Sequence, residues 1–234
     1  IVAADYEKGG YIAAFDRPSG TRLWRVARPK KLSFSSPVVA NVAGRDQLLI
    51  SGCELLSSYN PRTGNRLWAF PATTMATCGT MVWLDNLVFA SGGYPKAETI
   101  CMKADGSGEV VWKNPQKCYE QSMLAHDGYI YALTDQGIAY CWRAADGQQM
   151  WRSRLGGPVS ASPVLVGDTI YQTIENGTTF VYKANPKKFE LLAENKLGNS
   201  GFATPTICGN RIYIRTTQNV GGRQQDVLYC LGAK

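Results

Sequence analysis

Short runs in which apolar and polar residues alternate follow one another along the whole chain. In the clearest stretch, SSPVVA (35–40), QLLISGC (47–53) and LLSSYN (55–60) precede a PRTG turn and NRLWAF (65–70). Alternation with a period of two is typical of β-strands with one buried face, and Pro, Gly, Asp and Asn are the residues that turns require. The pattern therefore predicts four short antiparallel strands in this stretch and an all-β chain.

The four-strand pattern recurs about every forty residues, and two independent markers show the recurrence. A small residue at the start of the first strand falls at Ser36, Thr80, Ser122, Ser162 and Thr204, with steps of 44, 42, 40 and 42 residues. A tryptophan in the fourth strand falls at Trp24, Trp68, Trp112 and Trp151, with steps of 44, 44 and 39 residues. The fifth period has Leu191 where this spacing expects the tryptophan.

This period and strand content predict the blades of a β-propeller, because a single four-stranded blade cannot bury both faces and must stack on its neighbours. Propellers of the WD-repeat class would show Gly-His and Trp-Asp dipeptides, which the sequence lacks. We expect one propeller domain over residues 1–234 with four complete and two partial blades. The predicted blades are 1–28 (partial), 33–70, 77–114, 119–155, 159–195 and 202–234 (partial).

The tryptophans of the fourth strands have a structural role in this interpretation. An indole ring can cover the interface to the adjacent blade, while its N–H reaches a backbone carbonyl there. We therefore expect blade docking from Trp24, Trp68, Trp112 and Trp151.

Composition and charge narrow the classes of partner. The chain is 44% hydrophobic and 18% charged, and it has no apolar run long enough for a transmembrane helix. Its first residues, IVAADYEKGG, do not form a signal peptide. The net charge is +7, and part of it is concentrated in Arg17, Arg22, Arg25, Arg28, Lys30 and Lys31. This stretch could attract an acidic polymer or a membrane surface, but a solvated outer strand and loop is favoured. No nucleic-acid-binding pattern accompanies it, so no nucleic-acid partner is expected.

The seven cysteines and the single histidine restrict the possible chemistry. No CxxC motif occurs, which removes the usual zinc and thioredoxin-like signatures. Several cysteines lie in apolar strand patterns, so buried thiols are favoured over a disulfide framework, and both stay open. His126 lies in an Ala-His-Asp-Gly turn, where a solvated position is favoured over a catalytic one. With one histidine, most general-base and histidine-metal mechanisms have no support.

Three stretches carry a family resemblance: AFDRPSGTRLWRV, SYNPRTGNRLWAF and CWRAADGQQMWRS. They resemble the A-x-D-x-x-T-G-x-x-x-W repeat of quinoprotein-type propellers, which include pyrroloquinoline quinone (PQQ) alcohol dehydrogenases and an outer-membrane-assembly lipoprotein. Stretches such as SSPVVANVAGRDQLLISGC and ATPTICGNRIYIR resemble the PQQ-binding-like repeat proteins of planctomycete bacteria. Some of those proteins are labelled polyvinyl-alcohol dehydrogenases by similarity. The resemblance implies a bacterial protein in the periplasm or outside the cell.

The resemblance also implies that part of the ring is missing. The first unit begins at its second strand, and the last unit ends after its third. In closed propellers a strand from the other end of the chain completes the terminal blade and removes an open edge. Because Ile1 begins within a blade, we expect a C-terminal fragment of a seven- or eight-bladed protein whose N-terminal blades are absent.

The cofactor site of the dehydrogenases has no counterpart in these residues. The resemblance would require two adjacent cysteines, a tryptophan beneath the quinone, and a calcium ion held by Glu, Asn and Asp. The chain has no adjacent cysteines and no recognisable calcium cluster, so we expect no cofactor. PQQ with calcium belongs only to the alternative in which the missing blades complete the site.

Loops and strand starts are the remaining candidates for function, because rigid scaffolds carry binding residues on their loops. In a propeller, the residues at the starts of innermost strands line the channel and one open face. The candidates on this basis are Phe34, Cys78, Tyr119, Glu120, Gln121 and Phe202. Glu120 stands out as an acid in a segment that otherwise packs, although an ordinary polar strand start explains it as well. The Tyr94-Pro95-Lys96 loop is a further candidate for the rim.

We therefore expect a non-catalytic scaffold that binds a protein or polymer partner through a propeller face in an extracytoplasmic bacterial setting. The alternative is a PQQ-dependent alcohol dehydrogenase of the polyvinyl-alcohol type. A third hypothesis, a polysaccharide lyase or hydrolase, would need two convergent carboxylates that the sequence does not identify.

Overall fold

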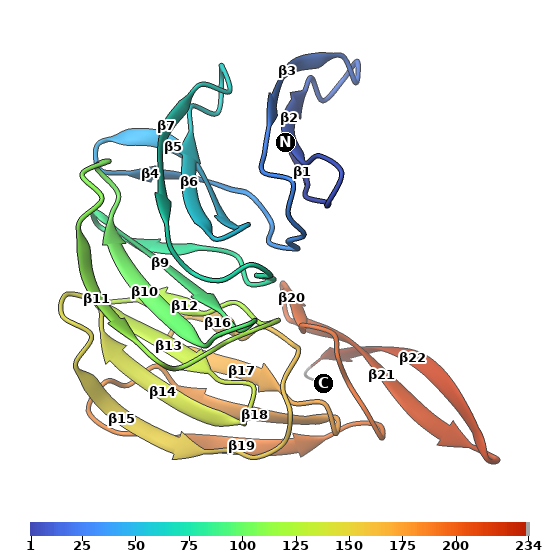
Figure 1. Ribbon diagram of the computed structural model, residues 1–234. Helices are drawn as coiled ribbons and strands as arrows, with labels where there is room; N and C mark the ends of the chain where they lie inside the picture. Colours follow the sequence, from blue (N-terminus) through green and yellow to red (C-terminus); the bar gives the residue numbers. More distant parts are fainter. Residues whose placement is uncertain (233–234) are drawn as a thin grey trace. The chain divides into compact units, whose positions relative to one another are not determined.

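The computed structural model describes residues 1–232, whose regular structure consists of β-strands (Figure 1). Six antiparallel sheets follow one another along the chain, four of them with four strands and two with three. The predicted all-β fold class is confirmed. None of the described residues forms a helix that could cross a membrane. The last two residues of the predicted final blade, Ala233 and Lys234, lie outside the described residues.

The chain divides into two compact units, which are described separately. One consists of Ile1–Ser122 with Ala144–Gly147, and the other of Met123–Arg143 with Gln148–Lys234. The single propeller domain predicted from the sequence stays a prediction.

The first unit contains three sheets, each with its strands in chain order. The first sheet contains β1 (Val2–Ala4), β2 (Tyr11–Phe15) and β3 (Arg22–Ala27). The second contains β4 (Val38–Val42), β5 (Arg45–Gly52), β6 (Leu55–Tyr59) and β7 (Arg66–Pro71). The third contains β8 (Val82–Leu84), β9 (Leu87–Gly92), β10 (Glu98–Lys103) and β11 (Val110–Asn114).

The second unit also contains three sheets with strands in chain order. One contains β12 (Leu124–His126), β13 (Tyr129–Leu133), β14 (Ile138–Arg143) and β15 (Gln149–Arg154). The next contains β16 (Val164–Val166), β17 (Thr169–Thr173), β18 (Thr178–Lys183) and β19 (Leu191–Lys196). The last contains β20 (Thr206–Cys208), β21 (Arg211–Val220) and β22 (Arg223–Gly232).

The cores form where apolar faces of neighbouring sheets meet, as the alternating pattern requires. In the first unit, Leu49 and Leu56 of the β4–β7 sheet share a buried cluster with Val88 and Ile100 of the β8–β11 sheet. In the second unit, a similar cluster joins the β12–β15 and β16–β19 sheets and includes Trp151. Within each unit, these neighbouring sheets therefore bury apolar faces against each other.

A β-bulge sets the position of each tryptophan on its outer strand. In the β12–β15 sheet, Trp151 lies opposite Cys141, and the register shifts directly after that pair. The β16–β19 sheet has a register shift at the equivalent place, and the pair directly before it is Val181 opposite Ala193. The prediction that Leu191 takes the tryptophan position is therefore wrong, and Ala193 occupies it. The repeat spacing pointed to the wrong residue because the turn before β19 is longer. Ala193 lies nine residues after Ala184, the first residue of that turn, whereas Trp151 lies seven residues after the equivalent Ala144.

Two local predictions also differ from the structure. The last hairpin is longer than the two runs predicted for it, since β21 and β22 pair over ten residues each up to Val220 and Arg223. His126, predicted within a turn, is the last residue of β12 and pairs with Tyr129. The turn there consists of Asp127 and Gly128, both with positive φ.

Candidate binding surface

The predicted strand-start residues of the first unit are joined by backbone hydrogen bonds from one sheet to the next. Phe34 N donates to Thr77 O at 2.9 Å, and Cys78 N donates to Tyr119 O at 3.3 Å. The starts before β4, β8 and β12 therefore lie side by side.

Their side chains differ in accessibility, which separates binding candidates from packing residues. Phe34 has 56% of its surface exposed. Glu120 is also exposed, whereas Cys78 and Tyr119 are half-buried and Gln121 is buried. The structure thus brings five of the six predicted candidates into one row in the first unit. The sixth, Phe202, precedes β20 in the second unit and is 57% exposed.

The turn between β9 and β10 adds a second exposed ring to this row. Tyr94 O accepts a hydrogen bond from Ala76 N at 3.4 Å, and the Tyr94 side chain is 55% exposed. A Cβ added to Gly93 would lie 2.6 Å from Tyr119 Cβ, so glycine is needed for Tyr119 to pack on this turn. Phe34 and Tyr94 therefore flank the same short segment, residues 76–77. We call Phe34, Tyr94 and Tyr119 the aromatic rim.

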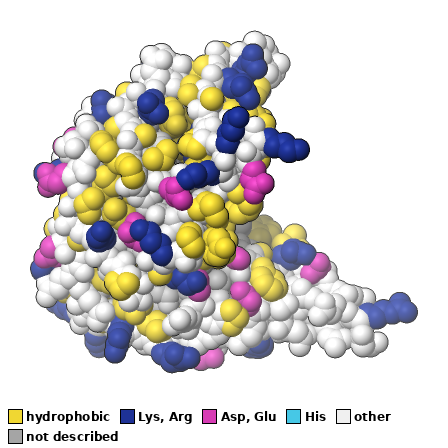
Figure 2. Space-filling view, viewed as in Figure 1, with side chains coloured by type: hydrophobic (Ala, Val, Ile, Leu, Met, Phe, Trp, Pro, Cys, Tyr) yellow, Lys and Arg dark blue, Asp and Glu magenta, His cyan; other side chains and the backbone are white. Residues whose placement is uncertain are grey.

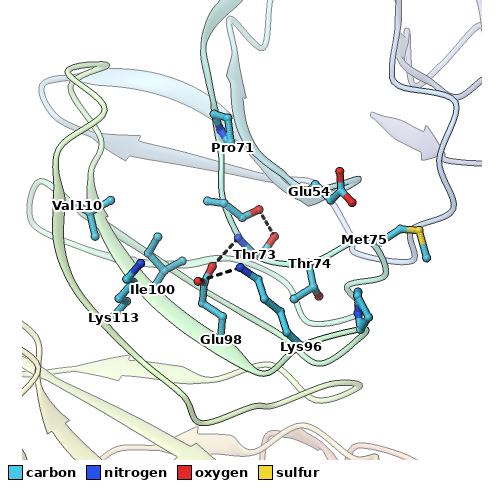
Figure 3. Close-up of a pocket in the computed structure, with 12 residues that line it drawn as sticks. Glu54, Pro71, Thr73, Thr74, Met75, Lys96, Glu98, Ile100, Val110 and Lys113 are labelled. Carbon is cyan, nitrogen blue, oxygen red and sulfur yellow. Dashed lines mark hydrogen bonds and ion pairs between the residues drawn. The ribbon is translucent and has the colours of Figure 1, made fainter.

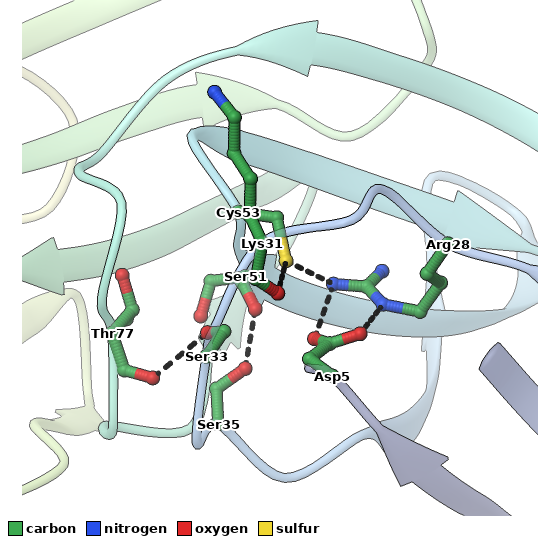
Figure 4. Close-up of polar contacts among 8 residues, drawn as sticks. All are labelled: Asp5, Arg28, Lys31, Ser33, Ser35, Ser51, Cys53 and Thr77. Atoms are coloured by element: carbon green, nitrogen blue, oxygen red, sulfur yellow. Dashed lines mark hydrogen bonds and ion pairs between the residues drawn. The ribbon is translucent and has the colours of Figure 1, made fainter. Parts of the chain in front are cut away.

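A buried ion pair anchors the segment that leads to Phe34 (Figure 4). Arg28 donates from Nε and Nη2 to the two carboxylate oxygens of Asp5, at 2.7 and 2.9 Å. Burial alone would lower the pKa of Arg28, but the hydrogen bond and the charge of Asp5 outweigh it and raise the pKa above its usual value. Arg28 was predicted to belong to a solvated basic stretch, and for this residue the prediction is wrong because Asp5 compensates its buried charge.

Four of the other five cations of that stretch lie toward solvent, and the fifth, Lys31, is half-buried and forms an ion pair with Glu54. Figure 2 shows Lys and Arg side chains over the β1–β3 sheet, and Arg17, Arg22, Arg25 and Lys30 are exposed. The Arg25 guanidinium lies 4.3 Å from the centre of the Tyr11 ring. This outer-strand arrangement matches the solvated strand favoured from the sequence.

Buried hydroxyl groups tie the same segment to the neighbouring strands. Ser33 Oγ donates to Thr77 O at 3.1 Å, and Ser35 Oγ donates to Ser51 O. Cys53 Sγ donates to Lys31 O at 3.3 Å (Figure 4). These side-chain to backbone bonds hold residues 31–35 in place on both sides.

The turn between β5 and β6 has an unusual backbone. Cys53 and Glu54 have φ of 57° and 62°, which is the left-handed pair of a type I′ hairpin turn. Gly52 before them has φ of 111°, and any Cβ there would overlap Ser33 Oγ. Burial raises the pKa of the Cys53 thiol to about 11, so this cysteine stays protonated at neutral pH. No sequence signal marks this turn, because Cys and Glu are not the usual residues of a type I′ turn.

A pocket of about 400 Å³ opens beside the aromatic rim (Figure 3). Glu98 lies 14% exposed in it, and its Oε1 accepts a hydrogen bond from Thr73 N at 3.0 Å. Lys96 Nζ lies 3.7 Å from Glu98 Oε2. Met75 and Pro95, which adjoin the segments of the rim, also line the pocket. The pocket therefore extends the surface of the aromatic rim. It has apolar walls and contains one positively and one negatively charged side chain.

Each motif tryptophan donates its indole N–H to a backbone carbonyl in the turn after the third strand of the next sheet. Trp68 donates to a glutamine side chain as well. Trp24 Nε1 lies 3.1 Å from Pro61 O, and Trp151 Nε1 lies 2.7 Å from Asn185 O. Trp112 Nε1 lies 2.8 Å from Ala144 O. Trp68 Nε1 donates to Gln47 Oε1 at 2.8 Å and to Ala104 O at 3.2 Å. The role of the four tryptophans in blade docking stays a prediction.

The described residues do not fit a quinone with calcium. Residues 1–232 contain no group of three or more His, Cys, Asp or Glu side chains placed to hold a metal ion. No disulfide joins the seven cysteines, all of which lie in this part of the chain. Cys208 and Cys230 are exposed, unlike the buried thiols favoured from the sequence.

Comparison with protein families gives a matching model. The family model described as outer membrane protein assembly factor BamB, of the PQQ-repeat type, matches residues 1–153 and 143–227.

Curated relatives carry the same description. The protein from Legionella pneumophila (strain Paris) is 21% identical over 115 residues, which are 49% of this chain and 29% of the relative. The protein from Bordetella pertussis (strain Tohama I) is 21% identical over 210 residues, which are 83% of this chain and 52% of the relative. The matches thus span about half or less of the length of these relatives.

Solved structures show the same fold. BamB from Moraxella catarrhalis superposes with a TM-score of 0.68 at 15% identity, covering 92% of this chain and 68% of that one. A chain in a crystal structure of the mitotic checkpoint complex gives a TM-score of 0.68 at 12% identity and covers 91% and 70%. The computationally designed Ika8 protein gives 0.60 at 12% identity and covers 91% and 66%. The predicted β-propeller fold is thereby confirmed.

Proposed function

The chain belongs to the family described as outer membrane protein assembly factor BamB, and from this membership we propose that it is a non-catalytic scaffold that binds a protein partner during outer-membrane protein assembly. We place this activity outside the cytoplasm, in the periplasm of a bacterium. The aromatic rim is the surface proposed to bind the partner.

The observation that carries the proposal is the pair of exposed aromatic rings on a firmly held backbone. Phe34 and Tyr94 are each more than half exposed, although large rings usually pack inside a protein. Both residues flank residues 76–77 through backbone hydrogen bonds. Aromatic residues on rigid loops are enriched among the residues that dominate binding energy at protein interfaces.

The surroundings of the rim match the anatomy of a protein interface. Interfaces have an apolar centre and a polar, charged periphery. Leu32, 39% exposed, and half-buried Met75 extend the apolar area near the rings. Lys96 and Glu98 in the adjoining pocket supply charges of both signs. A protein partner with its own apolar centre and mixed charges would be complementary to this surface.

The buried network beneath the rim also favours binding. The ion pair of Asp5 with Arg28 and the hydroxyl bond of Ser33 fix the segment before Phe34 in the absence of a partner. A surface that is already ordered loses less conformational entropy when it binds. The scaffold therefore contributes affinity without contacting the partner.

Site-specific photo-cross-linking in the intact protein tests this proposal. A photoreactive phenylalanine analogue is introduced at position 34 or 94, and at position 23 as a control, because Leu23 is 63% exposed in the same unit but lies outside the rim. We expect cross-links from positions 34 and 94 to one envelope protein and none from position 23. Equal cross-linking from all three positions, or none from 34 and 94, would contradict the proposal.

The F34A/Y94A double variant provides the matched affinity measurement with the cross-linked partner. Removal of two central aromatic side chains should weaken binding by about 10-fold or more. Alcohol-dependent dye reduction by the intact protein supplied with PQQ and calcium would contradict the non-catalytic part of the proposal.

A further inference from the structure

One interface in the second unit lacks the indole ring that its equivalents contain. Ala193 takes the tryptophan position on β19, because it lies opposite Val181 at the same point of the bulge as Trp151 opposite Cys141. Residues opposite each other in an antiparallel pair lie on the same face of the sheet. The Ala193 side chain therefore lies on the face that carries Val181.

An apolar cavity of about 90 Å³ lies against that face. We call it the open slot. On one side it is lined by Tyr171, Val181 and Leu197, together with the polar residues Thr179 and Asn195. On the other side it is lined by Pro205, Ile212 and Leu231, from the β20–β22 sheet and the segment before it. A slot with this lining offers few partners for water, whose stable binding requires several polar groups.

The preceding interface shows what such a slot contains when it is filled. Tyr131 lies opposite Cys141, as Tyr171 lies opposite Val181. The Trp151 ring lies 6.1 Å from the Tyr131 ring centre and is 8% exposed. The framework around Tyr171 is therefore equivalent, but Ala193 carries no ring to occupy the corresponding position.

We propose that the open slot binds an aromatic side chain of a peptide partner at the position that an indole occupies in the equivalent interfaces. The apolar lining favours a group without charge. The place beside the Tyr171 ring favours a planar ring, because the preceding interface has an indole beside the equivalent Tyr131. Burial of the ring and of the lining atoms supplies the driving force. The site lies in the second unit, so it is a binding site in addition to the aromatic rim, and it does not depend on the function proposed for that rim.

Methyl NMR of the intact protein tests the site with N-acetyl-L-tryptophanamide as the probe. We expect shifts of the Val181, Ile212 and Leu231 methyl signals, with a dissociation constant on the order of 1 mM for a single ring. N-acetyl-L-lysinamide at the same concentration should leave these signals unchanged. Absence of shifts at these three residues with the tryptophan probe, or equal shifts with octanoate, would overturn the assignment to an aromatic side chain.

Two variants separate the open slot from the rest of β19. Ala193→Trp supplies the missing ring, so probe binding should weaken at least ~10-fold, and the melting temperature should rise by roughly 2–4 °C for each kcal/mol gained. Glu194→Trp is the control, because Glu194 lies opposite Phe180 on the other face of the same sheet; its probe affinity should match that of the parent. Unchanged probe affinity in the folded Ala193→Trp variant would overturn the proposal. If the Ala193→Trp variant does not fold, the methyl shifts of the unsubstituted protein with the tryptophan probe test the proposal alone.

Discussion

Cysteine side chains at one repeated position differ widely in chemistry because their surroundings differ. Cys101, Cys141 and Cys230 each lie on the third strand of a sheet, opposite an aromatic residue of the second. Burial raises the pKa of Cys101 and of Cys141 to about 12. Cys230 is exposed, and the hydrogen bond from Arg211 Nη1 at 3.4 Å lowers its pKa below the ordinary value. The thiolate is the reactive form, so position in the repeat does not determine reactivity.

Alkylation with iodoacetamide, followed for each site by mass spectrometry, tests this difference. Because a lowered pKa increases the thiolate fraction at neutral pH, the reaction of Cys230 should rise with pH to a midpoint below that of an unperturbed cysteine. Cys101 and Cys141 should stay unmodified at pH 8.

Arg211→Gln is the matched control for this experiment. Loss of the guanidinium should move the Cys230 midpoint to higher pH, since the neutral amide stabilises the thiolate less. An unchanged midpoint would show that Arg211 does not control this thiol.

At the scale of the element, glycines in the turns of one sheet lie directly against tryptophan rings of the preceding sheet. Gly64, in the turn between β6 and β7, has φ of 77°, and a Cβ there would lie 2.7 Å from the Trp24 ring. Gly147 has φ of 72° and the same 2.7 Å approach to the Trp112 ring. The glycine of the sequence motif therefore serves both the turn and the ring from the preceding sheet.

Gly64→Ala should accordingly destabilise the protein more than a glycine replacement governed by backbone strain alone. Gly44 is the matched control, because its φ of 73° is similar and nothing lies within 4 Å of an added Cβ. Left-handed backbone costs an L-residue about 1–2 kcal/mol, and crowding of Trp24 should add about 1–3 kcal/mol in Gly64→Ala only. Urea unfolding of both variants measures the difference, and equal losses would refute the close approach.

The regular part of this architecture could be predicted from the sequence, whereas the exceptions could not. Alternation and turn residues predicted the strands because both arise from local backbone geometry. Ala193 was missed because the longer turn before β19 shifts the spacing, and only strand pairing shows the register. The long β21–β22 hairpin was missed because residues 217–226 are polar or glycine, apart from Val220, and carry no alternation.

Some candidate site residues could likewise be predicted from the sequence, whereas others could not. Phe34 and Tyr94 could be identified from their places in loops, since loop position follows from the strand pattern. The burial of Arg28 could not be predicted, because its partner Asp5 lies 23 residues away and a run of cations looks solvated. The pocket around Glu98 was missed for a similar reason, since Thr73 and Glu98 meet only after β7 and β10 have folded.

At the scale of the whole molecule, membership of the BamB-type family is established. The planctomycete subgroup, the fragment status and the seven or eight blades stay predictions. So does the single domain over residues 1–234, since contacts divide the chain into two units.

Differential scanning calorimetry of the protein tests the prediction of a single domain. If the blades form one cooperative structure, one transition should appear, with equal calorimetric and van't Hoff enthalpies. Two separate transitions, with one of them retained in a chain that ends at residue 122, would show independent folding units instead.

The bulge on the outer strands has a consequence for how such a protein can change over evolutionary time. The turn before β19 has two more residues than the equivalent turn before β15, yet the register shift follows the equivalent strand pair in both sheets. Insertions in these turns therefore leave the buried faces unaltered, as is usual for surface loops. Turn length can vary without a change of this register, so a peptide epitope or an affinity tag can be grafted into these turns if the carbonyl that accepts the indole N–H is kept.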